Sequence, residues 1–343
     1  MVDNQIKNYW YPWLNYPYQQ IIKQYHIKRG HHTLLLYAPY GLGIEVLLWK
    51  ISCLLMCSFT TTNFQSCGKC HSCQLMNSMN HPDLYVLDIL KKEKSSVGIE
   101  DIREIYDDLY QKSKLGTAKI LWILQPEKLT ESAVNLLLKI VEDPPTNTWF
   151  FFYSFEKTNI PIILRSRCQA WHIISPSEIE GLKWLKNNNG INKCPPITLI
   201  AALRLSYGAP IAALNLLKSQ DWPNRKKIYD EIMKNLFQLE IIKLLPLMNN
   251  ENVAKQIEWL CTLLLDALKL KYSDKKHIIN IDYYELVQRL SNNLSNEILL
   301  KILRQWCICR DHILHITSIS RELLLIKHLI IWNQLMQLNV NRS

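Results

Sequence analysis

The sequence lacks any long hydrophobic run. Its apolar stretches, such as 149–155 and 323–335, are short or are broken by lysine and histidine, whereas a membrane-spanning helix needs roughly 18 apolar residues in a row. Residues 1–13 are polar and aromatic and contain no apolar segment typical of a secretory signal. Internal repeats are absent, and 187–189 is the only short low-complexity tract. We therefore expect a cytoplasmic protein that makes no membrane contact.

The composition is that of a folded globular protein. At about 150 residues per domain, 343 residues predict two or three domains. With 48% hydrophobic and 20% charged residues, the chain is unlike a disordered protein or a coiled-coil rod. Forty basic against thirty acidic side chains leave a net charge of +10. That excess indicates either a nucleic-acid partner or only a lysine-rich surface, and most of it lies after residue 174.

The first half of the chain alternates between two hydrophobic periods. Apolar runs at 33–37, 84–87, 119–124, 149–154 and 170–174 predict strands, while 44–54, 99–110 and 130–142 have helical spacing. Such alternation is typical of a parallel α/β sheet. At Ser175 the pattern changes, because Ser175, Pro176 and Glu178 match a capping box with proline at the first helical position. From there to the C-terminus we expect an all-α chain.

The turn after the first predicted strand has the frame of a phosphate-binding loop. Such a loop places lysine on the phosphates and serine or threonine on magnesium, but here Gly41 and Gly43 are followed by Ile44 and Glu45. Residues 124–127, after the third predicted strand, likewise lack the aspartate that would hold magnesium. We therefore predict that the chain binds no ATP. The alternative is an unrelated strand-to-helix turn.

Four of the ten cysteines are spaced as metal ligands. They predict a structural zinc site without an open coordination position, because thiolates two residues apart can reach one tetrahedral ion; an iron–sulfur cluster is the lesser alternative. These four are Cys57, Cys67, Cys70 and Cys73. Cys53, His71 or His81 could compete as a ligand, although a core thiol and two surface imidazoles are the simpler interpretation. We interpret Cys307, Cys309 and His312 as residues of a helical bundle, since neighbours two apart on a helix point away from each other. We expect these two cysteines, together with Cys53, Cys194 and Cys261, to be core thiols.

A larger set of motifs resembles the delta-prime subunits of bacterial DNA polymerase III, the stators of AAA+ clamp loaders. The resemblance extends over nearly the whole chain. It implies a RecA-like AAA+ α/β domain at 1–174 with a zinc module inserted at about 57–73, an all-α lid at 175–220 and an all-α collar at 221–343. The motifs are the degenerate loop, the cysteine module and the segments 11–14, 29–32, 73–76, 81–83, 135–139, 142–145 and 166–168.

The resemblance also implies a function and a set of partners. Such a subunit hydrolyses no ATP but presents the arginine of a Ser-Arg-Cys motif, here Ser166, Arg167 and Cys168, to ATP on a neighbouring motor subunit. The complex, which includes the clamp-opening delta subunit, loads the sliding clamp on primed DNA, and only the complex has the enzyme class of a DNA-directed DNA polymerase, a nucleotidyltransferase. Arg165 is a weaker candidate, and Ile211 lies where ATP-binding relatives carry a sensor arginine.

Two other functions compete with this interpretation. The chain could be an active AAA+ ATPase, or it could be a zinc-bearing nucleic-acid-binding protein that acts alone. The degenerate loop argues against the first. Against the second, the sequence shows no aromatic and basic platform at a recognisable spacing. On sequence alone, a surface ion-pair residue is the favoured interpretation of Arg167, and the resemblance reverses that preference.

Overall fold

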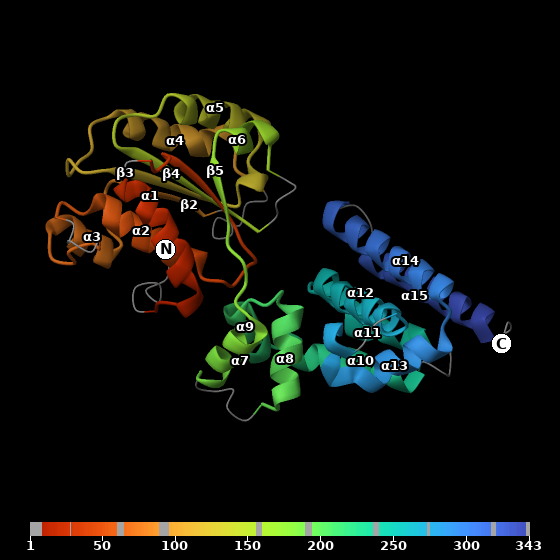
Figure 1. Cartoon of the computed structure of the whole chain (residues 1–343). Helices are drawn as coiled ribbons and strands as arrows, with labels where there is room; N and C mark the ends of the chain where they lie inside the picture. The colour runs from red at the N-terminus through yellow and green to blue at the C-terminus, as the bar shows by residue number, and fades with distance from the viewer. Residues whose placement is uncertain are drawn as a thin grey trace. The chain divides into compact units, whose positions relative to one another are not determined.

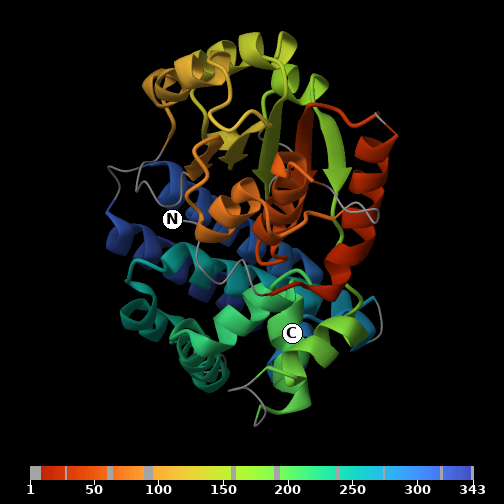
Figure 2. The ribbon, with the colours of Figure 1, turned by 90° about the vertical axis from the view of Figure 1, so that its left-hand side faces the viewer.

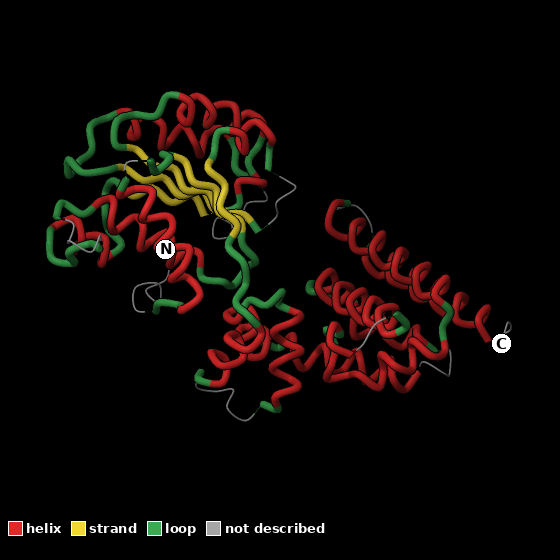
Figure 3. Tube along the Cα trace, in the orientation of Figure 1, coloured by secondary structure: helices red, strands yellow, loops and turns green. Residues whose placement is uncertain are grey.

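The computed structural model describes residues 9–27, 29–59, 65–88, 96–155, 160–188, 194–235, 240–272, 275–316 and 320–340. The chain divides into two compact units, Met1–Pro176 and Ser177–Ser343. Among the described residues, strands occur in the first unit alone, and those of the second unit form helices and turns (Figure 3). No single described helix is long and apolar enough to cross a membrane; two short helices, 196–205 and 210–218, reach such a composition only when joined across a 114° bend.

The first unit is built on a parallel five-stranded sheet, as the sequence predicts. Its strand order is β2-β3-β4-β1-β5, and every neighbouring pair is parallel. The last strand ends two residues earlier than expected, because its partner β1 ends at Tyr37, which leaves Ile174 82% exposed. The strands are β1 Thr33–Tyr37, β2 Leu84–Asp88, β3 Lys119–Leu124, β4 Thr148–Ser154 and β5 Gln169–His172.

Helices cover both faces of this sheet (Figures 1 and 2). Alternate strand residues, such as Leu35, Leu121 and Phe152, pack with the buried faces of α4 and α5. On the opposite face, the indole of Trp122 donates a hydrogen bond of 3.0 Å to Ser52 of α2. The helices are α1 Asn15–His26, α2 Ile44–Met56, α3 His71–Ser78, α4 Ile99–Tyr110, α5 Glu131–Glu142 and α6 Ile162–Ser166, with short 3-10 turns at Pro12–Leu14 and Pro126–Lys128.

The second unit begins two residues later than its predicted cap. Helix α7, Glu178–Lys186, is capped by Ser177, whose backbone N–H donates to Glu180 at 3.1 Å while its hydroxyl accepts from the Glu180 N–H at 3.3 Å. The prediction of Ser175 as the cap is therefore wrong. Both serines precede a glutamate by three residues, and the reciprocal bonds form at the second pair, which leaves Pro176 outside the helix.

The helices of the second unit enclose two hydrophobic clusters. A small one contains Leu185, Leu199 and Ala213, and a larger one extends from Leu216 to Met336. The division into lid and collar at residue 220 stays a prediction. The remaining helices are α8 Pro196–Leu205, α9 Pro210–Lys218, α10 Asp221–Asn235, α11 Leu245–Met248, α12 Val253–Leu270, α13 Tyr284–Asn293, α14 Asn296–His315 and α15 Arg321–Val340, with 3-10 turns at Ile241–Leu244, Lys275–His277 and Ile281–Tyr283.

Candidate functional site

The phosphate-loop frame follows β1 and leads directly into α2. Gly41 and Gly43 both have positive φ, 82° and 77°, and Gly43 is the N-cap of the helix. Ile44, at the position of the missing lysine, has no exposed surface. The indole of Trp13 donates a hydrogen bond of 2.9 Å to the Leu42 carbonyl. The loop therefore keeps the backbone shape of a phosphate site, while the side chain at its key position packs into the core.

Two glutamates, Glu45 and Glu127, lie close to this loop. Glu45 lies in the first turn of α2. Burial, and next the Glu45 carboxylate, raise the pKa of Tyr11 and of Tyr153. After β3, Gln125 takes a left-handed conformation with φ of 66°, and Glu127 follows in a 3-10 turn. The carboxyl ends of β1 and β3 thus bring together the backbone of a nucleotide site without the lysine or the aspartate that such a site uses.

The four predicted cysteine ligands lie together between α2 and α3. All four Sγ atoms are within 4.8 Å of one another, and two of the pairs are 4.0 and 3.9 Å apart. A tetrahedral zinc with sulfur ligands at 2.3 Å would separate the sulfurs by about 3.8 Å. Gly68, with φ of 69°, makes the turn inside the cluster. The four side chains could therefore hold one metal ion.

Backbone N–H groups favour thiolates in this cluster. The Cys67, Cys70 and Cys73 amides donate to the sulfurs of Cys57, Cys67 and Cys70, respectively, at 3.3 to 3.4 Å. Desolvation opposes ionisation of Cys70, but hydrogen bonds from the backbone of Cys73 and Ser58 and from two cluster thiols lower its pKa to about 6. Hydrogen bonds from the backbone of Cys70 and Lys69 likewise lower the pKa of Cys67, whereas burial raises the pKa of Cys57 and of Cys73. Thiolates are the form that binds metal, so the backbone favours the metal-binding form at Cys67 and Cys70.

The three other residues considered as ligands stay outside the cluster. Cys53 is a buried thiol whose pKa burial raises to about 12. His71 is exposed, as predicted.

The prediction that His81 is a surface imidazole is wrong, because its exposed fraction is only 4%. Its Nδ1 accepts from the Asp83 amide at 3.2 Å, and its Nε2 lies 2.8 Å from the hydroxyl of Ser72. That hydroxyl donates to the Met56 carbonyl, so Nε2 carries the ring proton and donates to Ser72. With both nitrogens occupied, His81 supports α3 and ligates no metal.

The cysteines of α14 form no metal site. Cys309 is buried and Cys307 is exposed, because residues two apart lie on different faces of the helix. The expectation that Cys307 is a core thiol is therefore wrong, whereas Cys261 and Cys309 are core thiols as expected.

Arg167 lies at the exposed C-terminal end of α6. Its side chain is 42% exposed, and its Nε donates to the carboxylate of Glu142 at the end of α5. Its Nη1 donates to the Ser166 hydroxyl at 3.1 Å, and that hydroxyl in turn donates to the Ile163 carbonyl at 2.8 Å. The third residue of the motif, Cys168, donates its thiol to the Leu164 carbonyl. Ser166 and Cys168 thus fix the turn that presents the arginine.

The sheet topology separates Arg167 from the phosphate-loop frame of its own chain. Arg167 comes two residues before β5 begins, where Gln169 pairs with Leu34 near the start of β1. The loop follows Tyr37 at the other end of β1. Five residues of strand span about 16 Å, so the arginine lies near the amino-terminal ends of β1 and β5, and the loop lies at the carboxyl-terminal end of β1. Glu142, the ion-pair partner, was not identified as such from the sequence, because α5 and α6 meet only in the folded unit.

Comparisons with known proteins place the chain in a family. Three family profiles cover the chain in succession: "DNA polymerase III, delta subunit" at 15–177, "DNA polymerase III subunit delta', AAA+ ATPase lid domain" at 176–218, and "DNA polymerase III, delta subunit, C terminal" at 219–334.

Similar proteins over the whole length have the same description, DNA polymerase III subunit delta'. The chain is 39% identical to one from Yersinia pestis over 94% of this chain and 95% of that protein. It is 36% identical to one from Buchnera aphidicola subsp. Schizaphis graminum (95% and 98%) and 36% identical to one from Escherichia coli (92% and 93%). The chain therefore belongs to the family of DNA polymerase III delta-prime subunits.

Proposed function

We propose that this clamp-loader subunit neither binds nor hydrolyses ATP and that it supplies Arg167 to ATP held by a neighbouring subunit. The position of Arg167 supports this proposal most directly, because the arginine lies near the amino-terminal end of β5, whereas the phosphate-loop frame follows the carboxyl-terminal end of β1. From there it can serve only a nucleotide on another chain. An arginine supplied in this way stabilises the charge on the transferring phosphoryl group.

The loop supports the first half of the proposal. With Ile44 in place of lysine, ATP loses an ion pair with its phosphates. Near a protein surface, two unit charges about 4 Å apart interact by roughly 4 kcal/mol, which is nearly three decades of affinity. Glu45 adds repulsion in the turn where the triphosphate would lie. The backbone frame alone does not replace these contributions.

The surroundings of Arg167 suit a protein interface. Ile162 and Ile163, on the same short helix, are 76% and 56% exposed, and exposed apolar side chains beside an arginine are typical of contact surfaces. The ion pair with Glu142 does not prevent Arg167 from binding a phosphate. Both side chains are more than 40% exposed, and such exposed pairs contribute only about 0.2–1 kcal/mol. Arg167 can therefore leave Glu142 for a phosphate.

The C-terminal helices supply a second contact surface. Leu300, Ile308 and Leu314 on α14 and Leu323 and Ile330 on α15 are each at least 44% exposed. Apolar residues at helical spacing favour packing against helices of other subunits. We assign this face to assembly with the motor subunits and the delta subunit, so that the sliding clamp and primed DNA are engaged through the complex, which alone has polymerase activity.

We assign the cysteine cluster to one structural zinc ion per chain. Zinc would join the end of α2, at Cys57, to the start of α3, at Cys70 and Cys73. Four thiolates leave no open position for a substrate. The ion therefore supports the fold locally and takes no part in ATP hydrolysis.

The role of Arg167 is tested in a reconstituted clamp loader by DNA-stimulated ATP turnover. Arg167→Ala should lower the turnover by about 10³-fold or more, with assembly unchanged in gel filtration. Glu142→Gln, which removes only the partner carboxylate, and Arg165→Ala should change it less than about fivefold. Unchanged turnover in Arg167→Ala would reject the role, and micromolar ATP binding to the isolated chain would reject the first half of the proposal.

The metal assignment is tested by elemental analysis of the purified chain. We expect about one zinc per chain and no iron. Cys70→Ser should lose most of the zinc, whereas the matched control Cys307→Ser changes an exposed cysteine outside the cluster and should retain it. A folded, metal-free wild-type chain would contradict the assignment.

A further inference from the structure

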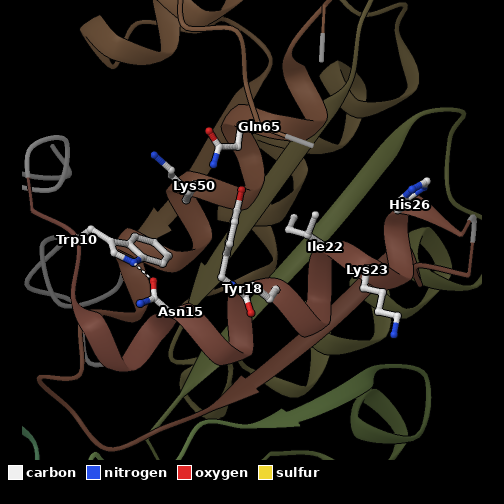
Figure 4. Close-up of a pocket in the computed structure, with 9 residues that line it drawn as sticks. Trp10, Asn15, Tyr18, Ile22, Lys23, His26, Lys50 and Gln65 are labelled. Carbon is white, nitrogen blue, oxygen red and sulfur yellow. Dashed lines mark hydrogen bonds between the residues drawn. The ribbon is translucent and has the colours of Figure 1, made fainter. Parts of the chain in front are cut away.

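A groove separate from the sites above lies between α1, α2 and Gln65. It has a volume of about 500 Å³, within the range of about 300–1,000 Å³ of ligand sites. Its lining on α1 extends from Asn15 to His26, which at 1.5 Å per residue is about 16 Å. Figure 4 shows Trp10 at one end, Tyr18 in the middle and His26 at the other end. A groove of this length is longer than a single bound ion requires.

The lining of the groove carries positive charge only. Lys23 comes from α1 and Lys50 from α2, and no aspartate or glutamate lines the groove. Helix α1 contains no acidic residue and α2 contains only Glu45. Neither Lys23 nor Lys50 forms an ion pair within the described part of the chain. The two ammonium groups are therefore available to an anionic ligand.

Two aromatic rings stand beside these charges. Trp10 and Tyr18 meet edge to face, with centroids 5.4 Å apart. The indole N–H of Trp10 donates to the Asn15 side-chain oxygen at 2.5 Å, which holds the ring in place. Both rings are half-buried, and Tyr18 extends toward Lys50 and Gln65 (Figure 4). An edge-to-face pair leaves a ring face open for stacking.

We propose that this groove binds a short run of single-stranded nucleic acid. Phosphodiesters would pair with Lys23 and Lys50, an unpaired base would stack on the aromatic pair, and the side-chain amides of Gln19 and Gln65 can both donate to and accept from base edges. An acidic peptide would pair with the lysines but has no base to stack on the two rings. The proposal is independent of the role of Arg167.

This groove also answers the argument against nucleic-acid binding drawn from the sequence. The aromatic and basic residues of the groove form no motif in the sequence, because Lys50 and Gln65 are far along the chain from Trp10 and Tyr18. Packing of α1 on α2 and the return of the chain at Gln65 bring these side chains to one groove.

The charge contribution is tested by fluorescence anisotropy of the full-length chain with a labelled oligodeoxythymidylate of about twelve nucleotides. The double variant Lys23→Ala with Lys50→Ala should bind about tenfold more weakly, and the slope of log affinity against log salt should fall by about 1.4, or 0.7 per lost phosphate contact. The matched control, Lys112→Ala with Lys114→Ala, removes two exposed charges outside the groove in the same unit. It should bind nearly as the wild type does.

The stacking contribution is tested by variants of Tyr18. Tyr18→Phe keeps the ring and should retain binding, whereas Tyr18→Leu keeps only apolar bulk and should weaken it by about tenfold. An abasic oligonucleotide of the same length should bind the wild-type chain more weakly than oligodeoxythymidylate. Circular dichroism checks that each variant is folded, and the double variant of Lys23 and Lys50 keeps the proposal testable if Tyr18→Leu does not fold.

Three results would overturn the proposal. The first is equal binding by the groove double variant and its control. In the second, the abasic and thymidine strands bind alike and Tyr18→Leu has no effect, so that the groove recognises phosphate alone. In the third, polyglutamate binds in a manner that depends on Lys23 and Lys50 while the oligonucleotide does not, so that the partner is an acidic peptide.

Discussion

The buried ion pair between Arg225 and Asp282 carries the largest stability effect that we expect from a single substitution. The side chain of Arg225 is only 1% exposed. Its two terminal nitrogens donate to the two carboxylate oxygens of Asp282 at 2.6 and 2.9 Å, and one of them also donates to Asn280 at 2.9 Å. Aromatic rings enclose the guanidinium, those of Trp222 and Tyr229 being within 4.7 Å of it. The pair joins α10 to the turn before α13.

Asp282→Ala removes the carboxylate and leaves the guanidinium buried. Arginine does not give up its proton in proteins, so the charge persists with Asn280 as its remaining hydrogen-bonded side chain. Two charge-assisted hydrogen bonds contribute roughly 1.5–3 kcal/mol each, and loss of one partner of a buried pair costs about 3–5 kcal/mol. We therefore expect the free energy of unfolding of this unit to fall by about 3–5 kcal/mol.

Hydrogen exchange of peptides from α10, measured across a urea series, reports the free energy of unfolding of this unit separately from that of the first unit. Glu297→Ala is the matched control, because its partner Lys301 and the glutamate itself are 56% and 64% exposed, and the loss should stay within about 0.5 kcal/mol. Replacing both charges, with Arg225→Met and Asp282→Leu, should recover most of the stability. A loss of unfolding free energy in Asp282→Ala no larger than that in Glu297→Ala would contradict this prediction.

Two further predictions concern a buried histidine and a closely packed glycine. His328 is 2% exposed with neither ring nitrogen bonded to a described residue, and burial, with Lys327 and His312, lowers its pKa. The unfolded chain then binds the proton first, so the unfolding free energy should fall below about pH 6.5 by at most about 1.4 kcal/mol per unit; urea titrations of His328→Phe should lack this component, and an identical pH profile would contradict the assignment. Gly30→Ala would place a Cβ 2.2 Å from the ring of Tyr25, whereas nothing lies within 4 Å of a Cβ at Gly98. Thermal unfolding should show a loss of about 1–3 kcal/mol for the first and a smaller loss, of at most about 1 kcal/mol, for Gly98→Ala, which replaces only the N-cap glycine of α4. Equal melting temperatures would refute the clash.

Several elements follow closely from the sequence because their signals are local. Helix α4 has the predicted bounds, and Thr130 caps α5 at the predicted start. The cysteine spacing identifies a cluster whose sulfurs do converge. Where two local signals of equal strength compete, the sequence cannot choose between them, and this explains the shift of the cap from Ser175 to Ser177.

Other features depend on contacts between distant residues. The sequence predicts His81 to be a surface imidazole, but in the folded unit Ser72 and the Asp83 amide occupy its two nitrogens. Arg225 lies in a strongly polar stretch, yet Asp282, 57 residues away, allows its burial. No periodicity encodes such pairs, since the energy of burying a charge depends on a partner that only the fold supplies.

Three features follow from residue type and spacing alone: a parallel α/β unit precedes an all-α unit, the phosphate loop lacks its lysine, and four cysteines share one short segment. These are properties of residue type and spacing, which act over a few positions along the chain. Two features depend on the tertiary structure. Arg167 and the phosphate loop lie near opposite ends of the strands, and one groove is lined by Trp10, Tyr18, Lys23 and Lys50. Strand order and helix packing set those distances, because they bring together residues that no local spacing relates.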